Sequence, residues 1–298
     1  MDAREITEAL GGRWRGRQGL ACCPAHQDSS PSLSIGMGKD GRVLVHCHAG
    51  CKADAVITEL RRMQLWPGHA EEMTEAEREE CHQRDADREA EERRYQDYID
   101  ALWRKTWRDA SPAHTSAIEN WLRVRGIDAV RLDLDRLPLR WAPRCPLGKT
   151  DAPAMIALMT DAVTGEACGL HRTFLLGDGS GKALGSKSRK MLGKAGIIRL
   201  SPDDEVELGL GICEGIETGL SLLAAGWGPI WTCGSLVGVR SFPTLSGIEA
   251  ITIFSDPKAH EIEAARGCAR RWASAWREAA VRIPGPGGDW NDVLGRAA

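Results

Sequence analysis

Residues 209–219 read GLGICEGIETG and place a carboxylate between an apolar run and a helical segment. The run Gly209–Cys213 is typical of a buried β-strand, and Glu217–Ala225 is typical of a helix. Glu214 stands where the strand ends, and Gly215 follows it with the backbone freedom that suits a tight turn. The stretch therefore predicts a strand–turn–helix unit with an acidic side chain at the carboxyl end of the strand.

The same alternation continues along residues 201–298. Further strands are expected at Pro229–Thr232, Ala250–Ser255 and Ala280–Ile283, with a long helix at Glu261–Ala279. Strands that alternate with helices form a mostly parallel sheet with helices on its faces. We therefore expect an α/β domain, whose binding site should gather at the carboxyl ends of the strands.

Acidic residues follow three of the expected strands. Glu214 follows the first, Asp256 ends the strand at 250–255, and Asp289 and Asp292 come after the last. Carboxylates at the ends of parallel strands can converge on one edge of the sheet, and magnesium or manganese prefers hard oxygen ligands. The expected Mg²⁺ or Mn²⁺ ligands are Glu214, Asp256, Asp289 and Asp292. Taken singly, each acid could instead be a helix N-cap or a surface charge.

Cysteines and histidines form two close pairs near the start of the sequence, Cys23-Pro-Ala-His26 and Cys47-His-Ala-Gly-Cys51. Zinc takes four nitrogen or sulfur ligands in a tetrahedron, and two short-spaced pairs supply them. We predict a structural zinc site, because four protein ligands leave no open position for catalysis. The predicted ligands are Cys23, His26, Cys47 and Cys51. Neighbouring Cys22, His46 and His48 leave other ligand registers open, and the alternative is that the whole group fills a small core.

Composition limits the classes of protein that fit. The 298 residues are 42% hydrophobic, which is enough for two compact units with real cores. The formal net charge of −3 excludes a globally basic nucleic-acid binder, so DNA contacts must come from local patches. Ten cysteines without a secretion signal favour metal binding in a cytoplasmic protein over a disulfide framework. No apolar run is long enough for a membrane span, so no membrane partner is expected.

The remaining segments are assigned by pattern. Residues 70–109 are rich in Glu, Asp and Arg and predict a solvated helix. Strands are expected at Leu33–Ile35, Val43–His46, Leu139–Trp141, Ala154–Thr160 and Gly169–Leu175, helices at 52–63 and 118–125, and a proline-rich turn at Pro143–Pro146.

A basic cluster precedes the acidic strands. Its members are Arg172, Lys182, Lys187, Arg189, Lys190 and Lys194, and Arg123 and Arg125 can extend the same surface. Lysine and arginine within reach of phosphates are sufficient for binding nucleic acid or nucleotides, although charge alone fits a solvated loop equally well. The segment Gly177–Lys182 is not a Walker A loop, because Ala183 stands where the motif needs a hydroxyl.

Together these motifs resemble a known family. The stretch from Cys23 through Pro31-Ser32-Leu33 to Cys51 is similar to the CHC2-type zinc finger of bacterial and phage primases. The motifs at Glu214 and Asp256 resemble the Toprim domain of the same enzymes, and Gly287-Gly288-Asp289-Trp290-Asn291-Asp292 resembles the acidic tail motif of phage-type primases. The resemblance implies a CHC2 zinc-binding domain at 1–67, a charged helical linker at 68–112, a basic primase-core subdomain at 113–200 and a Toprim domain at 201–298.

The resemblance also implies an activity. Primases make short RNA primers on single-stranded DNA from ribonucleoside triphosphates, here for plasmid, prophage or phage replication, with Zn²⁺ and Mg²⁺ or Mn²⁺ as cofactors. The implied catalytic residues are Glu214, Asp256 and Asp289. A separate helicase or replication initiator is the implied partner, because the sequence has no Walker A motif and ends soon after Asp292.

One departure from the family pattern separates the possible functions. Toprim domains normally carry Asp-x-Asp and then a small-residue turn that ends in Gly, whereas this sequence reads Asp256-Pro257-Lys258-Ala259-His260-Glu261. Lys258 replaces the second Asp. Either another acid (Asp289, Asp292 or Glu217) compensates, or the protein binds nucleic acid without synthesis. A Toprim nuclease is a third possibility.

Overall fold

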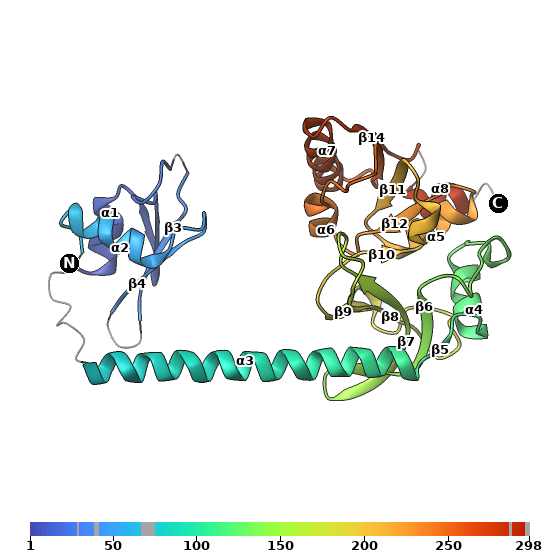
Figure 1. The fold of residues 1–298 in the computed structure, drawn as a ribbon, viewed down its shortest axis with the longest axis horizontal. Helices are drawn as coiled ribbons and strands as arrows, with labels where there is room; N and C mark the ends of the chain where they lie inside the picture. The colour runs from blue at the N-terminus through green and yellow to red at the C-terminus, as the bar shows by residue number, and fades with distance from the viewer. Residues whose placement is uncertain (29, 39–41, 67–74, 286–287, 296–298) are drawn as a thin grey trace. The chain divides into compact units, whose positions relative to one another are not determined.

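The computed structural model of the chain describes residues 1–28, 30–38, 42–66, 75–285 and 288–295 (Figure 1). Two compact units, Met1–Glu89 and Ala90–Ala298, are distinguished by their internal contacts. The expected first domain end at Pro67 and Gly68 lies outside the described residues, as does Gly287 of the tail motif. Among the described residues, no helix is both long and apolar enough to cross a membrane.

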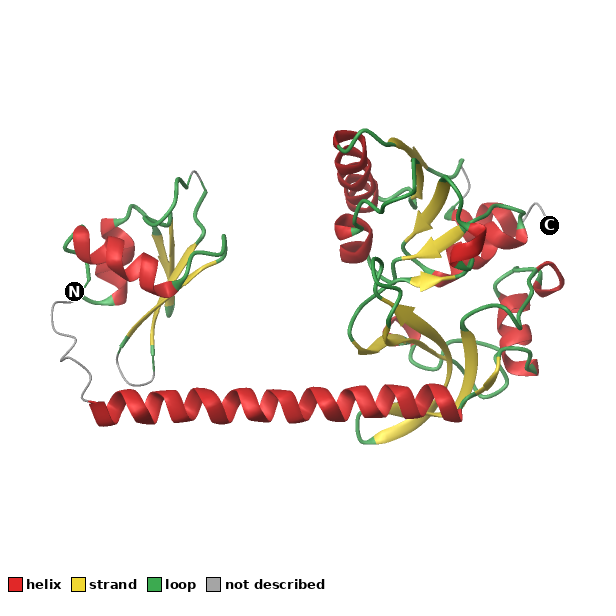
Figure 2. Ribbon diagram, viewed as in Figure 1, coloured by secondary structure: helices red, strands yellow, loops and turns green. Residues whose placement is uncertain are grey.

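The first unit is a small antiparallel sheet with two helices against it (Figure 2). Its strands follow the order β1-β2-β3-β4, and its elements are α1 (Ala3–Ala9), β1 (Arg13–Arg15), β2 (Gln18–Ala21), β3 (Leu33–Met37), β4 (Val43–Cys47) and α2 (Ala53–Arg62). Ile6 of α1 and Leu60 of α2 are fully buried together with Leu33 and Ile35 of β3, because these apolar residues recur on one face of each element. The expected strands and helix of this unit are confirmed, and β1 and β2 are additional strands.

The charged segment forms the helix α3 (Glu75–Asp109). Its surface carries pairs of opposite charge one turn apart, such as Lys105 with Asp109, which stabilise an exposed helix. Toward its end Trp103 is buried against Leu170 and Phe174 of the following sheet. Most of the described length of α3 is therefore exposed to solvent, and its C-terminal end packs into a hydrophobic core.

A second antiparallel sheet, with the order β5-β6-β7-β8-β9, follows α3. It consists of β5 (Ser111–Pro112), β6 (Leu139–Leu147), β7 (Thr150–Thr160), β8 (Ala167–Phe174) and β9 (Arg189–Gly193), and α4 (Ser116–Val124) lies between the first two strands. The expected turn at Pro143–Pro146 is wrong, because β6 continues through both prolines with an irregularity between Ala142 and Cys145. Among the described residues, β6 pairs beyond Trp141 only with β7, and an edge strand with an irregularity is where a sheet tolerates proline.

The third sheet has the order β10-β12-β11-β13-β14 and is parallel except for β10. Its elements are β10 (Ile198–Arg199), β11 (Gly209–Cys213), α5 (Ile216–Ala224), β12 (Ile230–Thr232), α6 (Leu236–Ser241), β13 (Ala250–Phe254), α7 (Ala259–Ser274), β14 (Glu278–Arg282) and α8 (Trp290–Gly295). Buried side chains of α5 share one core with Cys213 and Phe254, while those of α6 and α7 share another with Ile212 and Ile253. The predicted α/β sheet with helices on both faces is confirmed.

Two boundaries in this sheet differ from the expectation. The helix expected up to Ala279 ends at Ser274, and β14 begins at Glu278 rather than at Ala280. Trp276 adopts a φ of 58° just after the helix and is 95% exposed, so the chain reverses there although no glycine marks the turn.

Candidate metal and catalytic sites

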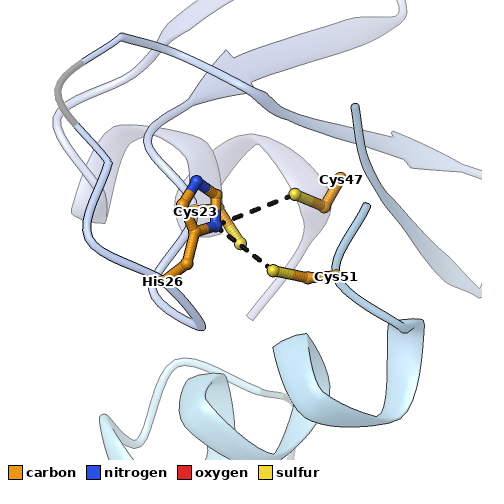
Figure 3. Close-up of side chains that lie close together, drawn as sticks. All are labelled: Cys23, His26, Cys47 and Cys51. Atoms are coloured by element: carbon orange, nitrogen blue, oxygen red, sulfur yellow. Dashed lines mark hydrogen bonds between the residues drawn. The ribbon is translucent and has the colours of Figure 1, made fainter. Parts of the chain in front are cut away.

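The cysteine and histidine pairs converge in the first unit (Figure 3). One ligand atom from each of four side chains lies within 4.8 Å of all the others, and the residues are Cys23, His26, Cys47 and Cys51. Strand β2 leads into the first pair, and the second pair lies between the end of β4 and the start of α2. Three sulfur ligands and one nitrogen ligand form a donor set that fits tetrahedral zinc. The neighbouring Cys22 and His48 are not in this group, and His48 instead hydrogen-bonds Ser34.

Asp28 contacts two of the four predicted zinc ligands, Cys23 and His26, and the sequence pattern did not predict this role. Its carboxylate accepts hydrogen bonds from the Cys23 amide (2.8 Å) and the Ser32 hydroxyl (2.5 Å) and lies 3.7 Å from Nε2 of His26. These donors, the Cys23 amide first, lower the pKa of Asp28 to about 2. Such contacts fix the ring that faces the metal position and are typical of the groups that orient metal ligands.

The Cys47 thiol is prepared to ligate. Burial acts to raise its pKa, but the backbone amides of Cys51 and Ala49 outweigh burial and lower the pKa to about 6. Because the thiolate is the form that binds metal, Cys47 is ready as a ligand at neutral pH.

In the second unit, a cavity of about 310 Å³ opens at the carboxyl ends of β11 and β13. Ionisable side chains of both signs line it. The carboxylates are Glu214, Glu217, Asp256, Glu261 and Asp289, and the cations are Arg125, Lys182, Arg189 and Lys258. The predicted acids Glu214, Asp256 and Asp289 therefore share one cavity, the first two from the ends of β11 and β13 and the third from the residue before α8.

Glu214 and Asp256 come from neighbouring parallel strands. Cys213 pairs with Phe254, so both strands end at the same level and their next residues face the cavity. Burial, together with the nearby carboxylate of Glu261, raises the pKa of both acids. Arg189 and Lys258 act in the opposite direction on Glu214, and the Trp290 amide and Lys258 do so on Asp256, but they do not outweigh burial. A divalent cation would relieve the remaining cost of these buried charges.

Among the described residues, these carboxylates do not form a group as tight as the one in the first unit. Magnesium does not require one, since it usually keeps several waters and binds one or two carboxylates plus substrate phosphates. An all-oxygen donor set in a polar cavity therefore fits magnesium or manganese.

Helix α8 positions Asp289. The Trp290 indole donates to the Ser255 carbonyl (3.1 Å), and the ring packs edge-on against Phe254 (5.2 Å between centroids), which anchors α8 to the end of β13. Asp292 is not among the residues that line the cavity. Its amide donates to the Asp289 carboxylate (2.9 Å), so it belongs to the first turn of α8.

Glu217 is almost completely buried, with 4% of its side chain exposed, and it contacts three cations. Its carboxylate lies 2.9 Å from Arg125, 2.9 Å from Arg189 and 3.2 Å from Lys182. Burial acts to raise its pKa, but the cations, Arg189 first, outweigh burial and lower it. Trp121 of α4 lies beneath Arg125 and Lys182, with 5.9 Å and 5.5 Å to the ring centroid. Glu217 therefore gathers cations from three segments onto the wall of the cavity and is not free to replace the missing carboxylate.

The predicted basic cluster divides in the structure. Arg189 lines the cavity, whereas Lys187, Lys190 and Lys194 are exposed and are not among its lining residues. Arg172 is buried, and its guanidinium donates to the carbonyls of Pro146 and Met191. The prediction that Arg172 belongs to a phosphate-binding surface is therefore wrong. Its side chain lies in the interior of the sheet, where its guanidinium bonds to β6 and β9.

Lys258, which replaces the second Asp of the family pattern, forms an ion pair with Glu261, which stands at the Gly position of that pattern. Nζ of Lys258 lies 2.9 Å from Oε1 of Glu261, in the first turn of α7. The Lys258 side chain is 62% exposed at the rim, whereas that of Glu261 is 11% exposed. Glu261 was not predicted from the sequence to be a residue of the cavity. The one signal in the sequence is that Glu261 stands where the family pattern ends its turn in Gly.

Comparison with known proteins identifies two regions. A family model described as "Toprim domain" matches residues 209–298, and one described as "Domain of unknown function (DUF7146)" matches residues 99–198. Curated protein sequences give no match.

Solved primase structures are similar at low identity. The Aquifex aeolicus primase (zinc-binding and RNA polymerase domains) is 12% identical over 98% of this chain and 80% of its own, with a TM-score of 0.46. The primase fragment of the bacteriophage T7 primase-helicase protein is 13% identical over 91% of this chain and 92% of its own, with a TM-score of 0.41. A DnaG primase catalytic domain bound to single-stranded DNA is 11% identical over 66% and 74%, with a TM-score of 0.48.

Proposed function

Since a family model described as "Toprim domain" matches residues 209–298, we propose that this protein is a DNA primase that makes short RNA primers on single-stranded DNA in plasmid, prophage or phage replication. The observation that carries the proposal is the composition of the cavity. It combines carboxylates from the ends of β11 and β13 and from the start of α8 with cations gathered by Glu217, and templated nucleotide joining needs both groups side by side.

The carboxylates would hold the metal. Glu214, Asp256 and Asp289 are the residues that would bind Mg²⁺ or Mn²⁺, and the bound ion would neutralise charge that develops on the transferred phosphate. Glu214 would also align the attacking 3′ hydroxyl, because it leaves its strand at the centre of the sheet.

The cations would hold the incoming nucleotide. Arg125, Lys182 and Arg189 outnumber the single carboxylate of Glu217, so this wall keeps an excess of positive charge toward the cavity. A ribonucleoside triphosphate placed with its phosphates on this wall would present them to the neighbouring carboxylate-bound ion.

The remaining parts of the proposal concern partners. The Cys23/His26/Cys47/Cys51 group would bind Zn²⁺ and fold a template-contacting module. The exposed Lys187, Lys190 and Lys194 would contact template phosphates outside the cavity. A helicase or replication initiator would be the protein partner.

A second candidate function rests on Lys258. Its ammonium, paired with Glu261, puts a positive charge where the family has a metal ligand. This observation favours a nucleic-acid-binding protein without synthesis.

Primer synthesis separates the two candidates. The zinc-loaded chain is incubated with single-stranded DNA, labelled ribonucleotides and Mg²⁺ or Mn²⁺. We expect short products from the natural chain and none from Glu214→Gln or Asp256→Asn. The matched control is Glu263→Gln, an exposed acid of α7 outside the cavity, which should keep full activity. DNA binding without any product from the natural chain would reject the primase and support the second candidate.

A further inference from the structure

The charges of the cavity are already partly compensated within the protein. Three cations surround Glu217, and Lys258 holds Glu261 at 2.9 Å. Among the residues that the structure describes, the lining carboxylates Glu214, Asp256 and Asp289 have no such ion pair.

Three such carboxylates suffice for one divalent ion. Magnesium typically takes one or two carboxylates from the protein and completes its shell with water and phosphate oxygens. A second ion would need a further carboxylate at position 258, where this chain instead presents an ammonium. Like charges repel, so the ammonium opposes the binding of a second cation at this position.

Lys258 and Glu261 form a single compensated unit. Lys258 precedes α7 as its N-cap residue, and Glu261 lies in the first turn with its side chain largely buried. Both positions differ from the Asp and Gly that the family pattern places there, so the two changes together replace an acidic ligand by an ion pair.

We propose that this cavity binds one divalent ion rather than two, and that the Lys258–Glu261 ion pair takes the place of the second. The ion binds one or two of the carboxylates Glu214, Asp256 and Asp289 and completes its shell with water and phosphate oxygens. The Lys258 ammonium stays paired with Glu261, so it occupies the position of the second ion without adding net charge. This inference rests on the proposed function for the identity of the metal site, and it adds the number of ions and the role of Lys258.

The test counts bound manganese. Mn²⁺ is titrated into the zinc-loaded full chain in the absence of nucleotide, and free Mn²⁺ is followed by electron paramagnetic resonance. We expect one Mn²⁺ per natural chain. The variant Lys258→Asp with Glu261→Gly restores the family pattern and should bind two.

Two single variants are titrated beside the natural chain and the double variant. Lys258→Ala frees the Glu261 carboxylate and should add a second, weaker site, with an affinity at least about tenfold above any second site of the natural chain. Arg266→Ala removes an exposed cation of α7 that does not line the cavity and should leave the count at one. Since Lys258 is 62% exposed, its single substitution should not impair folding.

The manganese counts either support or overturn the inference of a single ion. Two Mn²⁺ ions of similar affinity on the natural chain, no Mn²⁺ at all, or a count that Lys258→Ala and the double variant leave unchanged would overturn the inference. A count of one that rises in these variants supports it even if primer synthesis is absent, in which case only the proposed function fails. Conversely, primer synthesis by a chain that binds two ions retains the function and rejects the inference.

Discussion

The Glu217→Gln substitution tests whether the buried carboxylate organises the cation wall. The change keeps the shape of the side chain but removes a charge that contacts Arg125, Lys182 and Arg189 at 2.9–3.2 Å. Breaking a buried ion pair by removing one partner costs about 3–5 kcal/mol. The cations are 28–47% exposed, so water compensates part of the loss, and we expect a destabilisation near the lower end, about 3 kcal/mol.

Urea unfolding followed by tryptophan fluorescence measures this change. With a denaturant slope of about 2 kcal/mol per molar urea, the midpoint should fall by about 1.5 M. Because the folded pKa of Glu217 lies below its ordinary value, its contribution is present above the unfolded pKa and is lost as pH falls through the folded pKa. The difference between the two proteins should therefore shrink in acid.

The control for this experiment is Glu166→Gln, an exposed acid in the turn between β7 and β8. A midpoint for Glu217→Gln that matches this control at neutral pH would refute the reasoning, since the cations would then not depend on the carboxylate.

Three further predictions follow from other sites. Cys47→Ser should release the zinc and unfold the first unit, because ligation energy is its folding energy; zinc analysis and circular dichroism measure this, and a folded, metal-free unit would contradict it. Changing the exposed Lys187, Lys190 and Lys194 together to Ala should weaken single-strand binding and reduce the slope of log K against log salt by about 0.7 per lost phosphate contact, whereas an unchanged slope marks a solvated surface. Burial, reinforced by Arg189, lowers the pKa of His171 to about 4, so the unfolded chain binds a proton first and stability should fall between pH 6.5 and 4, by up to about 3 kcal/mol. The same pH dependence in His171→Asn would show that other groups cause it.

Much of the cavity could be predicted because it depends on local pattern. A carboxylate directly after an apolar strand must lie at the strand end, and parallel neighbours bring such ends together, as for Glu214 and Asp256. The zinc ligands are similar, since each pair is only a few residues apart and β3 and β4 need only a short antiparallel ladder to bring the pairs together.

The cation wall could not be predicted in this way. Arg125 reaches Glu217 from α4, and Lys182 and Arg189 reach it from a segment that reads as a Gly- and Lys-rich loop. From their charge, Arg172 and Arg189 were equally good candidates for phosphate binding. In the fold, Arg172 is buried between strands, whereas Arg189 lines the cavity. Glu261 was hidden for a related reason, because only the fold shows that the first turn of α7 faces the strand ends.

The central claim is that the cavity joins ribonucleotides on a DNA template. The most direct measurement is the incorporation of labelled ribonucleotides by the zinc-loaded chain, with single-stranded DNA present or omitted, and with Glu214→Gln in parallel. The account predicts short, alkali-labile products that require the template and Mg²⁺ or Mn²⁺ and disappear in Glu214→Gln. Products that form without template, or that Glu214→Gln makes as well as the natural chain, would contradict it.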